Sequence, residues 1–422
     1  MRYAWLWCLL ATGGLTAGPQ DSETNVNTRY TVETVSVTGA GFDGDVAASR
    51  DHRISSGLRR EITGLIGEKL NPARLDELAK RLRKELHART VEHRVLRGKT
   101  PEYVQVIFAI EVPPTRFDVS VPKFVYQGKQ GWSGAVEGTA TVHHNGFTLG
   151  LVSDGDELVE RYAGITARYE DAHLGSDRVH FTFEYDDYHE QWNGATMAAA
   201  GNGQGPAAYR TRQNFEPMIS FAVARPFTIS FGTSFERFDD EAPVAGAPSG
   251  VQAANAMIGS ARYHENWEGA DYQQDFNAEY DLREGMRSLG SDFGYGRHRW
   301  QVRYVLTHGR SVVSDEVTTG VITGQAPVYE RFVLGNSTTL RGWNKYDLDP
   351  LGGNRMVHNS VEYHYGVLQL FYDSGAIWDR GQNVIARNSV GIGLRQGGFS
   401  VALAFPLRDG RAEPMFMVGM NY

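Results

Sequence analysis

The stretch PFTISFGTSF, residues 226–235, alternates large apolar side chains with small or polar ones. In a β-strand successive side chains point to opposite faces, so this spacing divides the segment into two chemically different faces. Threonine, serine and glycine occupy one face, and the other carries Phe227, Ile229, Phe231 and Phe235. A strand that is bulky and apolar on one side and small on the other suits a transmembrane β-barrel, with lipid outside and a lumen inside.

The same alternation continues to the last residue of the chain. FSVALAF, residues 399–405, repeats it, and so does the final stretch MFMVGMNY, residues 415–422. The C-terminal strand signal, which is the lipid-facing side of that final strand, consists of Phe416, Val418, Met420 and Tyr422. In a secreted β-sandwich, the main alternative, the second face would meet water and carry more Lys and Glu. At roughly 19 residues per strand and connection, residues 116–422 accommodate about 16 antiparallel strands.

Charge and the N-terminal segment exclude other classes of protein. The chain has a formal net charge of −8, so no basic field exists to attract nucleic acid as a partner. Residues 1–18 have the layout of a secretory signal peptide, with Arg2, an apolar run and small residues at the end. A membrane anchor, the alternative, would need about 20 apolar residues. The single cysteine, Cys8, lies in this segment, so the processed protein is expected to contain no disulfide.

Residues 28–112 show helical as well as strand periodicity. Apolar residues recur at helical spacing over 54–70 and again after Asn71-Pro72, which supplies an N-cap and a proline at the first helical position. Strand patterns cover 28–39, 91–98 and 103–112. The order β-α-α-β-β predicts one small α+β domain before the barrel. Its 91–98 strand is short and basic, and we expect it to offer an edge to which an extended polypeptide can add.

A loop between two barrel strands contains TLRGW, residues 339–343, among Gly, Asn, Asp and Pro. On the strands that follow, the alternation places Glu362 and Asp373 on the lumen face. Two carboxylates in a confined lumen repel each other, and each gains from a nearby cation. If the loop folds inward, Arg341 can bridge both through its planar fork of donors. The sequence therefore predicts a plug tied down by Arg341.

These segments resemble the BamA/TamA-like outer-membrane assembly and transport superfamily. The loop residues Leu340, Arg341, Gly342 and Trp343 resemble its (V/L)RG(F/Y/W) motif, and FYDSG resembles its F-x-D-x-G motif through Phe371, Asp373 and Gly375. NSVGIGLR and SVALAFPL resemble the closing strands of its bacterial surface antigen barrel domain. Residues 28–112 are similar to its periplasmic POTRA domains, of which family members usually carry two or more. The resemblance implies a 16-stranded barrel and a contact between Arg341 and Asp373.

The resemblance also implies a function that involves no catalysed reaction. The protein is expected in the bacterial cell outer membrane, with its N-terminal domain in the periplasm, where it inserts or translocates polypeptides without ATP. No enzymatic activity, cofactor or metal is expected. The expected partners are outer-membrane lipid, unfolded or extended polypeptide clients that reach the periplasmic domain, and accessory subunits. The alternative is a passive pore or a structural barrel that kept the fold without the transport activity.

Three further motifs have alternative interpretations. His358 and Ser360 share a strand face, as in an outer-membrane phospholipase, but that face is the lumen side, away from lipid. Asp347 and Asp349 could bind calcium together with backbone carbonyls, but solvated turn residues explain them better. The adjacent His143 and His144 would point in opposite directions on a strand, which disfavours a metal site.

The seam between the first strand, 116–126, and the last strand, 412–422, is expected to be weak. It contains Pro122, Pro414 and Gly419. Proline cannot donate to a ladder, and glycine weakens a strand. We therefore expect this lateral seam to open sideways and to template an incoming strand.

Overall fold

The computed structural model describes residues 29–39, 42–45, 54–86, 88–111, 115–176, 178–199, 209–224, 226–240, 250–269, 271–408 and 413–420. The chain divides into two compact units, Met1–Pro113 and Pro114–Tyr422, and each is described by itself. The predicted signal peptide, residues 1–18, lies outside the described residues. None of the described helices combines the length and apolarity that crossing a membrane would require.

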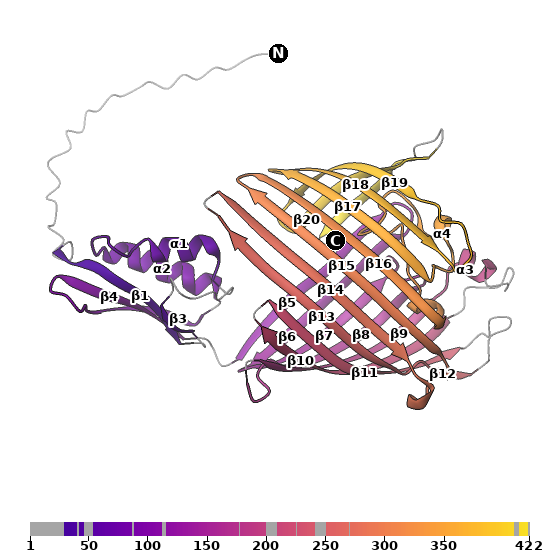
Figure 1. Ribbon diagram of the computed structural model, residues 1–422, viewed down its shortest axis with the longest axis horizontal. Helices are drawn as coiled ribbons and strands as arrows, with labels where there is room; N and C mark the ends of the chain where they lie inside the picture. Colours follow the sequence, from indigo (N-terminus) through magenta and orange to yellow (C-terminus); the bar gives the residue numbers. More distant parts are fainter. Residues whose placement is uncertain are drawn as a thin grey trace, which may run out of the picture. The chain divides into compact units, whose positions relative to one another are not determined.

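The N-terminal unit is a small sheet with two helices on one face (Figure 1). Its elements are β1 (Thr31–Gly39), β2 (Phe42–Asp45), α1 (Ser56–Thr63), α2 (Pro72–Glu85), β3 (Thr90–Arg97) and β4 (Tyr103–Glu111). The sheet order is β2-β1-β4-β3, with β1 and β4 parallel and the outer strands antiparallel to them. The sequence predicted every element except β2, whose four residues, FDGD, are too short to show an alternation.

Local signals explain where the two helices begin and end. The Asn71 side chain accepts hydrogen bonds from the backbone N–H groups of Ala73 and Arg74, and Pro72 occupies the first turn of α2. The predicted helix over 54–70 is shorter in the structure, because Gly64 caps α1 and Gly67 adopts φ +84°. The apolar faces of both helices pack on the sheet in one core, which includes Leu58, Ile62, Leu78, Leu82, Val35 and Phe108.

The second unit is a closed antiparallel barrel (Figure 1). Its strands are β5 (Thr115–Gln127), β6 (Gly131–Val142), β7 (Asn145–Asp154), β8 (Arg161–Asp171), β9 (Val179–Gln191), β10 (Tyr209–Ala224), β11 (Phe227–Asp240), β12 (Val251–Ala253), β13 (Ala256–Glu268), β14 (Tyr272–Gly285), β15 (Gly294–His308), β16 (Ser311–Gln325), β17 (Arg355–Tyr365), β18 (Leu368–Trp378), β19 (Arg387–Gln396), β20 (Phe399–Pro406) and β21 (Met415–Met420). β12 and β13 both pair with β11 and share one position. The 17 labelled strands therefore fill 16 positions, which confirms the predicted number.

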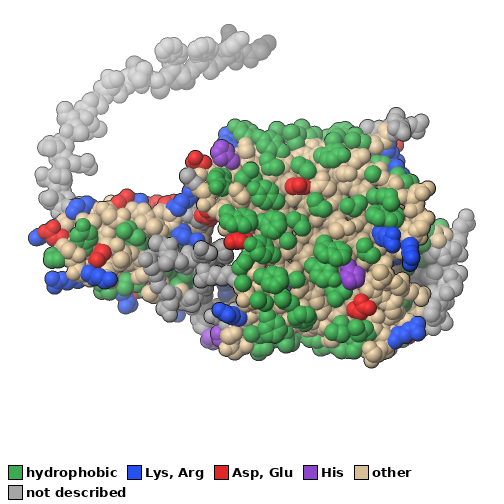
Figure 2. All heavy atoms as spheres, in the orientation of Figure 1, with side chains coloured by type: hydrophobic (Ala, Val, Ile, Leu, Met, Phe, Trp, Pro, Cys, Tyr) green, Lys and Arg blue, Asp and Glu red, His purple; other side chains and the backbone are tan. Residues whose placement is uncertain are grey.

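The barrel wall is apolar outside and small or polar inside, as the alternation predicts. Along β11, Phe231 is 60% exposed, whereas its neighbours Ser230 and Ser234 are buried. Along β7, Leu149 and Leu151 are equally exposed. Figure 2 shows apolar side chains spread over the outer face of the barrel. In water such a surface would be unfavourable, and in a bilayer it is what the lipid tails require.

The two ends of the barrel differ in their connections. Tight turns close the hairpin end, at 143–144, 309–310, 366–367 and 397–398. The loop end carries the longer connections, which are 155–160, 192–208 with α3 (Gly194–Ala199), 286–293 with η2 (Arg287–Leu289), and 326–354 with η3 (Val328–Glu330) and α4 (Lys345–Leu348). The TLRGW motif belongs to the last of these.

The barrel closes through a short ladder between its first and last strands. Met417–Met420 of β21 pair with Phe124–Gln127 of β5, close to the loop end. By comparison, the ladder between β14 and β15 covers all of Tyr272–Gly285. In the part of the chain that the structure describes, the ladder with β21 does not reach the Thr115–Ser120 half of β5. The predicted closing partners are thus confirmed.

Candidate functional site

The 326–354 connection folds into the lumen instead of extending from the loop end. A bridge between Phe332 and Gly353 closes its neck. Beyond the neck, residues 335–349 form the inward loop, in which Leu340 is fully buried and Trp343 nearly so. Leu340 and Trp343 join a core with Phe332, Leu334, Tyr295, Ile322 and Met356. Apolar burial therefore packs the inward loop in the lumen before any ion pair is considered.

Arg341 lies between the two carboxylates that the alternation placed in the lumen. Its Nε and Nη2 donate to Asp373 Oδ2 and Oδ1 at 2.8 and 2.7 Å, which is a bidentate pair. The Arg341 backbone N–H donates to Asp373 Oδ2 at 3.1 Å, and Nη1 donates to Glu362. Asp373 is fully buried and the Arg341 side chain is 7% exposed. The predicted contact between Arg341 and Asp373 is present, and both side chains are buried.

Neighbouring strands complete the pocket for the guanidinium. Ser360 Oγ accepts from Arg341 Nη2 at 2.9 Å and donates to Asp373 Oδ1 at 2.7 Å. The ring of Phe371 lies under the guanidinium, with its centroid 3.7 Å from Arg341 Cζ. A Cβ at Gly391 would approach that ring to 1.9 Å, so only glycine leaves room for it. The resemblance implied Phe371, and Gly391 is a supporting residue that the sequence analysis missed.

The other motif residues attach the inward loop to the last strands. Gly342 adopts φ +90°, and a Cβ there would lie 3.2 Å from Pro406 N and 3.3 Å from the carbonyl carbon of Ala404. Glycine is therefore needed both for the conformation and for the close approach to β20. Trp343 Nε1 donates to the Asn388 carbonyl on β19 at 2.9 Å. Leu340 fills the core described above, and Gly375, on the lumen side of β18, contacts Leu334.

A second set of contacts, which the sequence analysis missed, attaches the inward loop to the first strands. Ser337 donates to the Asp156 carboxylate from its backbone N–H at 2.9 Å and from its hydroxyl. Lys345 Nζ donates to the Gly155 carbonyl at 2.7 Å and to the Leu158 carbonyl. Lys123 of β5 pairs with Asp156 at 3.2 Å. Burial lowers the pKa of the Lys345 ammonium to about 8, against the opposing attraction of Asp156.

The neck of the connection is attached to the opposite wall. The Glu330 carboxylate pairs with Arg283 of β14 at 3.3 Å and with Arg297 of β15 at 3.5 Å. Tyr329 lies under the guanidinium of Arg212, 4.7 Å from the ring centroid. No sequence motif signalled these contacts. The connection is therefore fixed at its neck to β10, β14 and β15, and at its tip to β17 and β18.

The side chains of the hydrolase and calcium interpretations have other contacts in the structure. Ser360 uses its hydroxyl in the contacts with Arg341 and Asp373. Asp347 pairs with Arg408. Asp349 accepts from the backbone N–H of Leu351. Among the residues that the structure describes, no group of three or more His, Cys, Asp or Glu side chains could hold a metal ion.

Gly419 lies in the paired part of the seam as expected, whereas the two prolines lie outside the residues that pair across it. A Cβ at Gly419 would lie 2.1 Å from the carbonyl oxygen of Phe124, so β21 approaches β5 through a glycine. Pro122 lies within an irregularity in the β5–β6 ladder, between Ser120 and Lys123. Pro414 directly precedes β21. On the outer face of β21, Phe416 and Met420 are exposed and Val418 is half-buried. Tyr422 lies outside the described residues.

A closed barrel with an apolar outer wall and an inward loop held by buried ion pairs defines a β-barrel membrane protein with a plugged lumen. Residues 270–414 match the family model of the Omp85 superfamily domain. A segment of 137 residues is 30% identical to the outer membrane protein assembly factor BamA of Nitratidesulfovibrio vulgaris, and covers 27% of this chain and 17% of that protein. Residues 270–414 thus form an Omp85 superfamily domain, and the chain is similar to BamA/TamA-like outer-membrane barrels.

Solved structures share the fold at low sequence identity. BamA from Haemophilus ducreyi, lacking POTRA domains 1–3, superposes with a TM-score of 0.57 at 15% identity, over 93% of this chain and 84% of that one. CdiB from Acinetobacter baumannii superposes with a TM-score of 0.53 at 14% identity, over 93% of this chain and 74% of that one. The match to the curated relative spans less than a fifth of that protein's length.

Proposed function

We propose that this protein inserts or translocates polypeptides at the bacterial outer membrane by opening its lateral seam, without ATP and without enzymatic chemistry. The observation that carries this proposal is the short ladder between β5 and β21, which pairs Met417–Met420 among the described residues. One further backbone hydrogen bond, from Gly128 N–H to the Phe416 carbonyl at 2.9 Å, extends it at the loop end. Each ladder hydrogen bond contributes about 0.5–1.5 kcal/mol net. A seam of four residues therefore separates far more readily than the ladders of the opposite wall.

An opened seam offers what an incoming strand needs. In lipid, every backbone N–H and C=O group must find an internal partner. The edge of β5 can provide those partners to an extended client segment, in the manner of strand addition. Gly419 weakens the seam further, because a strand that approaches its neighbour through glycine has no side chain to pack there.

A reversible lock of the seam tests the proposal. Val418 lies directly opposite Tyr126, so Tyr126→Cys together with Val418→Cys places two thiols across the seam, with Cys8→Ser removing the single natural cysteine. The probe is a urea-unfolded eight-stranded barrel protein, whose folding into vesicles containing the locked protein is followed. We expect oxidation to abolish the acceleration of folding and reduction to restore it. The matched control joins Leu370 to Ile392, an opposed pair on β18 and β19 away from the seam.

Acceleration that persists with the seam fully crosslinked refutes lateral opening. In that case the passive pore becomes the better explanation, and one observation favours it. A cavity of about 650 Å³ lies beside the inward loop and is lined by charged residues such as Arg299, Arg303 and Glu316. The test compares solute flux into vesicles that contain the protein with and without residues 335–354. If removal of these residues increases the flux and leaves client folding unchanged, the protein is a passive pore.

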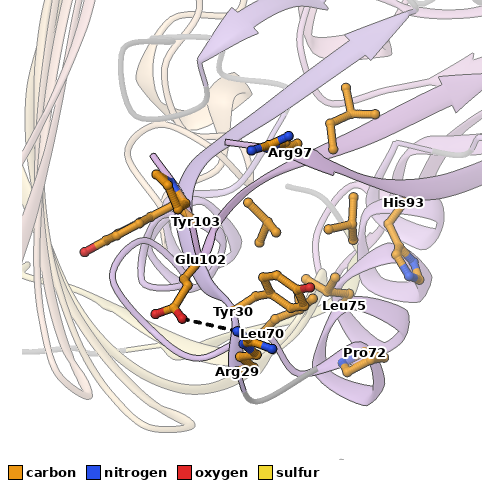
Figure 3. Close-up of a pocket in the computed structure, with 13 residues that line it drawn as sticks. Arg29, Tyr30, Leu70, Pro72, Leu75, His93, Arg97, Glu102 and Tyr103 are labelled. Carbon is orange, nitrogen blue, oxygen red and sulfur yellow. Dashed lines mark ion pairs between the residues drawn. The ribbon is translucent and has the colours of Figure 1, made fainter. Parts of the chain in front are cut away.

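The N-terminal unit is proposed to be a POTRA-like periplasmic domain that receives extended clients. β3 is an edge strand that pairs only with β4 in the described sheet. Beside it lies a pocket of about 690 Å³, lined by Leu70 and Leu75 of the helical side and by Val95 and Leu96 of β3. Figure 3 shows Arg97 and Tyr103 at this pocket, with Arg29 and Glu102 joined by an ion pair on its rim.

A client strand added to β3 could place an apolar side chain in this pocket. Leu96 is 48% exposed and Val95 40%, so both keep apolar surface that a client side chain could cover. The test replaces Val95 and Leu96 singly with proline, which removes the backbone donor on one side or the other. We expect one of the two variants to stay folded and to lose crosslinking of an extended client peptide. Equal crosslinking by every folded variant would show that the edge is not used.

A further inference from the structure

The inward loop contacts strands on both sides of the seam. On the C-terminal side, Arg341 binds Asp373 of β18, Gly342 lies against β20, and Trp343 binds the backbone of β19. On the N-terminal side, Ser337 binds Asp156 in the β7–β8 turn, and Lys123 of β5 binds the same carboxylate. Gln130 in the β5–β6 turn donates to the Gly335 carbonyl at 2.9 Å. An uninterrupted series of contacts therefore runs from β5 to β18–β20 and bypasses β21.

We propose that the inward loop is a brace across the seam, and that the Asp156–Ser337 and Lys345 contacts are the latch that releases when the seam opens. This inference rests on the proposed function. Asp156 and Lys345 are positioning residues, because they act on the seam through the inward loop. The seam strands alone share four paired residues on each side, so the brace adds cohesion where the ladder is shortest.

The charges on the two sides of the inward loop determine which barrel wall separates from the loop. Separating Arg341 from Asp373 would leave a fully buried carboxylate without its cation, and an uncompensated buried charge is strongly unfavourable. Separating Ser337 from Asp156 leaves that carboxylate paired with Lys123 at 3.2 Å. Lys345 would then regain water, which favours its charged form. The inward loop therefore stays with β17–β20, and the wall from β5 to β8 moves away from it.

Two disulfide locks on opposite sides of the loop test this asymmetry. The release-side lock joins Asp156→Cys to Ser337→Cys, whose native side chains are hydrogen-bonded. The control lock joins Asp347→Cys to Arg408→Cys, which form an ion pair at 3.3 Å between the loop and the connection after β20. Both are closed by oxidation or, where oxidation is incomplete, by a short cleavable bismaleimide, in the Cys8→Ser background.

The readout is amide hydrogen exchange in β5 and β21, because these amides exchange when the seam opens. We expect the release-side lock to slow their exchange at least tenfold, and the control lock to leave it within twofold. Conversely, Asp156→Asn combined with Lys345→Met should accelerate exchange at the seam at least tenfold, with exchange in β14–β16 unchanged. A general loss of stability would accelerate exchange in β14–β16 as well, and would overturn the positioning role.

Folding of the urea-unfolded barrel probe separates this inference from the function on which it rests. If the Tyr126–Val418 lock leaves probe folding unchanged, the proposed function fails. If that lock abolishes probe folding while the release-side lock leaves both exchange and folding unchanged, the latch is refuted and seam opening stands. Equal slowing by both loop locks refutes the asymmetry, because the loop would then have to leave both walls.

Discussion

Replacing Arg341 with alanine should release the inward loop from β17 and β18 while the barrel stays closed. The change removes a bidentate pair with the fully buried Asp373 and a pair with the largely buried Glu362. Breaking a buried pair by removing one partner typically costs about 3–5 kcal/mol. At 1.36 kcal/mol per factor of ten, the population of released loop should rise roughly 10²- to 10⁴-fold. No strand pairing depends on this side chain.

Limited proteolysis of the inward loop in the detergent-solubilised protein measures this population, because cleavage tracks the open fraction when opening is fast. Arg341→Lys keeps the charge without the fork and should recover only part of the protection. Arg408→Ala, which removes an exposed pair with Asp347 and a cation–π contact with Trp343, should reduce protection much less than Arg341→Ala. In a double-mutant cycle with Asp373→Ala we expect a coupling of at least about 1.5 kcal/mol. Additive effects of the two substitutions would refute direct pairing.

Gly342→Ala should also release the tip of the inward loop, because φ +90° and the approach to Ala404 both exclude a Cβ; unchanged loop proteolysis would contradict this. Docking of Lys345 should strengthen as pH rises from about 8 towards the ordinary lysine value near 10.4, since the released loop binds more protons in that window. The direction of this pH dependence is checked by measuring the protection of residues 335–349 from amide hydrogen exchange, corrected for the intrinsic pH dependence of exchange. N-terminal sequencing of membrane-extracted protein should begin near Gly18–Asp21, and a retained Met1 would contradict a signal peptide.

The strand period explains how much of the barrel could be predicted from the sequence. Because side chains alternate strictly along a strand, the apolar side fixes which residues face the lumen. That rule placed Glu362 and Asp373 on the lumen face, and their negative charges then predicted a cation nearby. Electrostatics favoured a cation between them, and Arg341 could supply it only if the loop folded inward. The short β2 had no such pattern, and α1 ends early because of Gly64 and a turn that still buries the apolar residues beyond it.

Contacts across the lumen could not be predicted from the sequence, for a physical reason. On β5 the exposed Phe117 and Val119 would place Lys123 on the outer face by strict alternation, and only the irregularity between Ser120 and Lys123 turns it inward. Its partner Asp156 and the loop residue Ser337 come from segments 181 residues apart, and only the folded path of the loop brings them together. The same holds for Glu330 with Arg283 and Arg297. The residues that form such contacts follow no local sequence periodicity, so the contacts cannot be inferred from the sequence.

The strands also differ in length around the barrel, and the bilayer must respond to this. β15 has 15 residues and the described part of β21 has 6. At a rise near 3.4 Å per residue and a tilt near 40°, these strands span roughly 39 and 16 Å along the membrane normal. The apolar band of an outer-membrane barrel is about 25 Å tall, so the six described residues of β21 by themselves cover less than its height. Lipids thin or tilt where a wall is shorter than the hydrocarbon layer, so we expect the bilayer to be thinner beside β21 than beside β15.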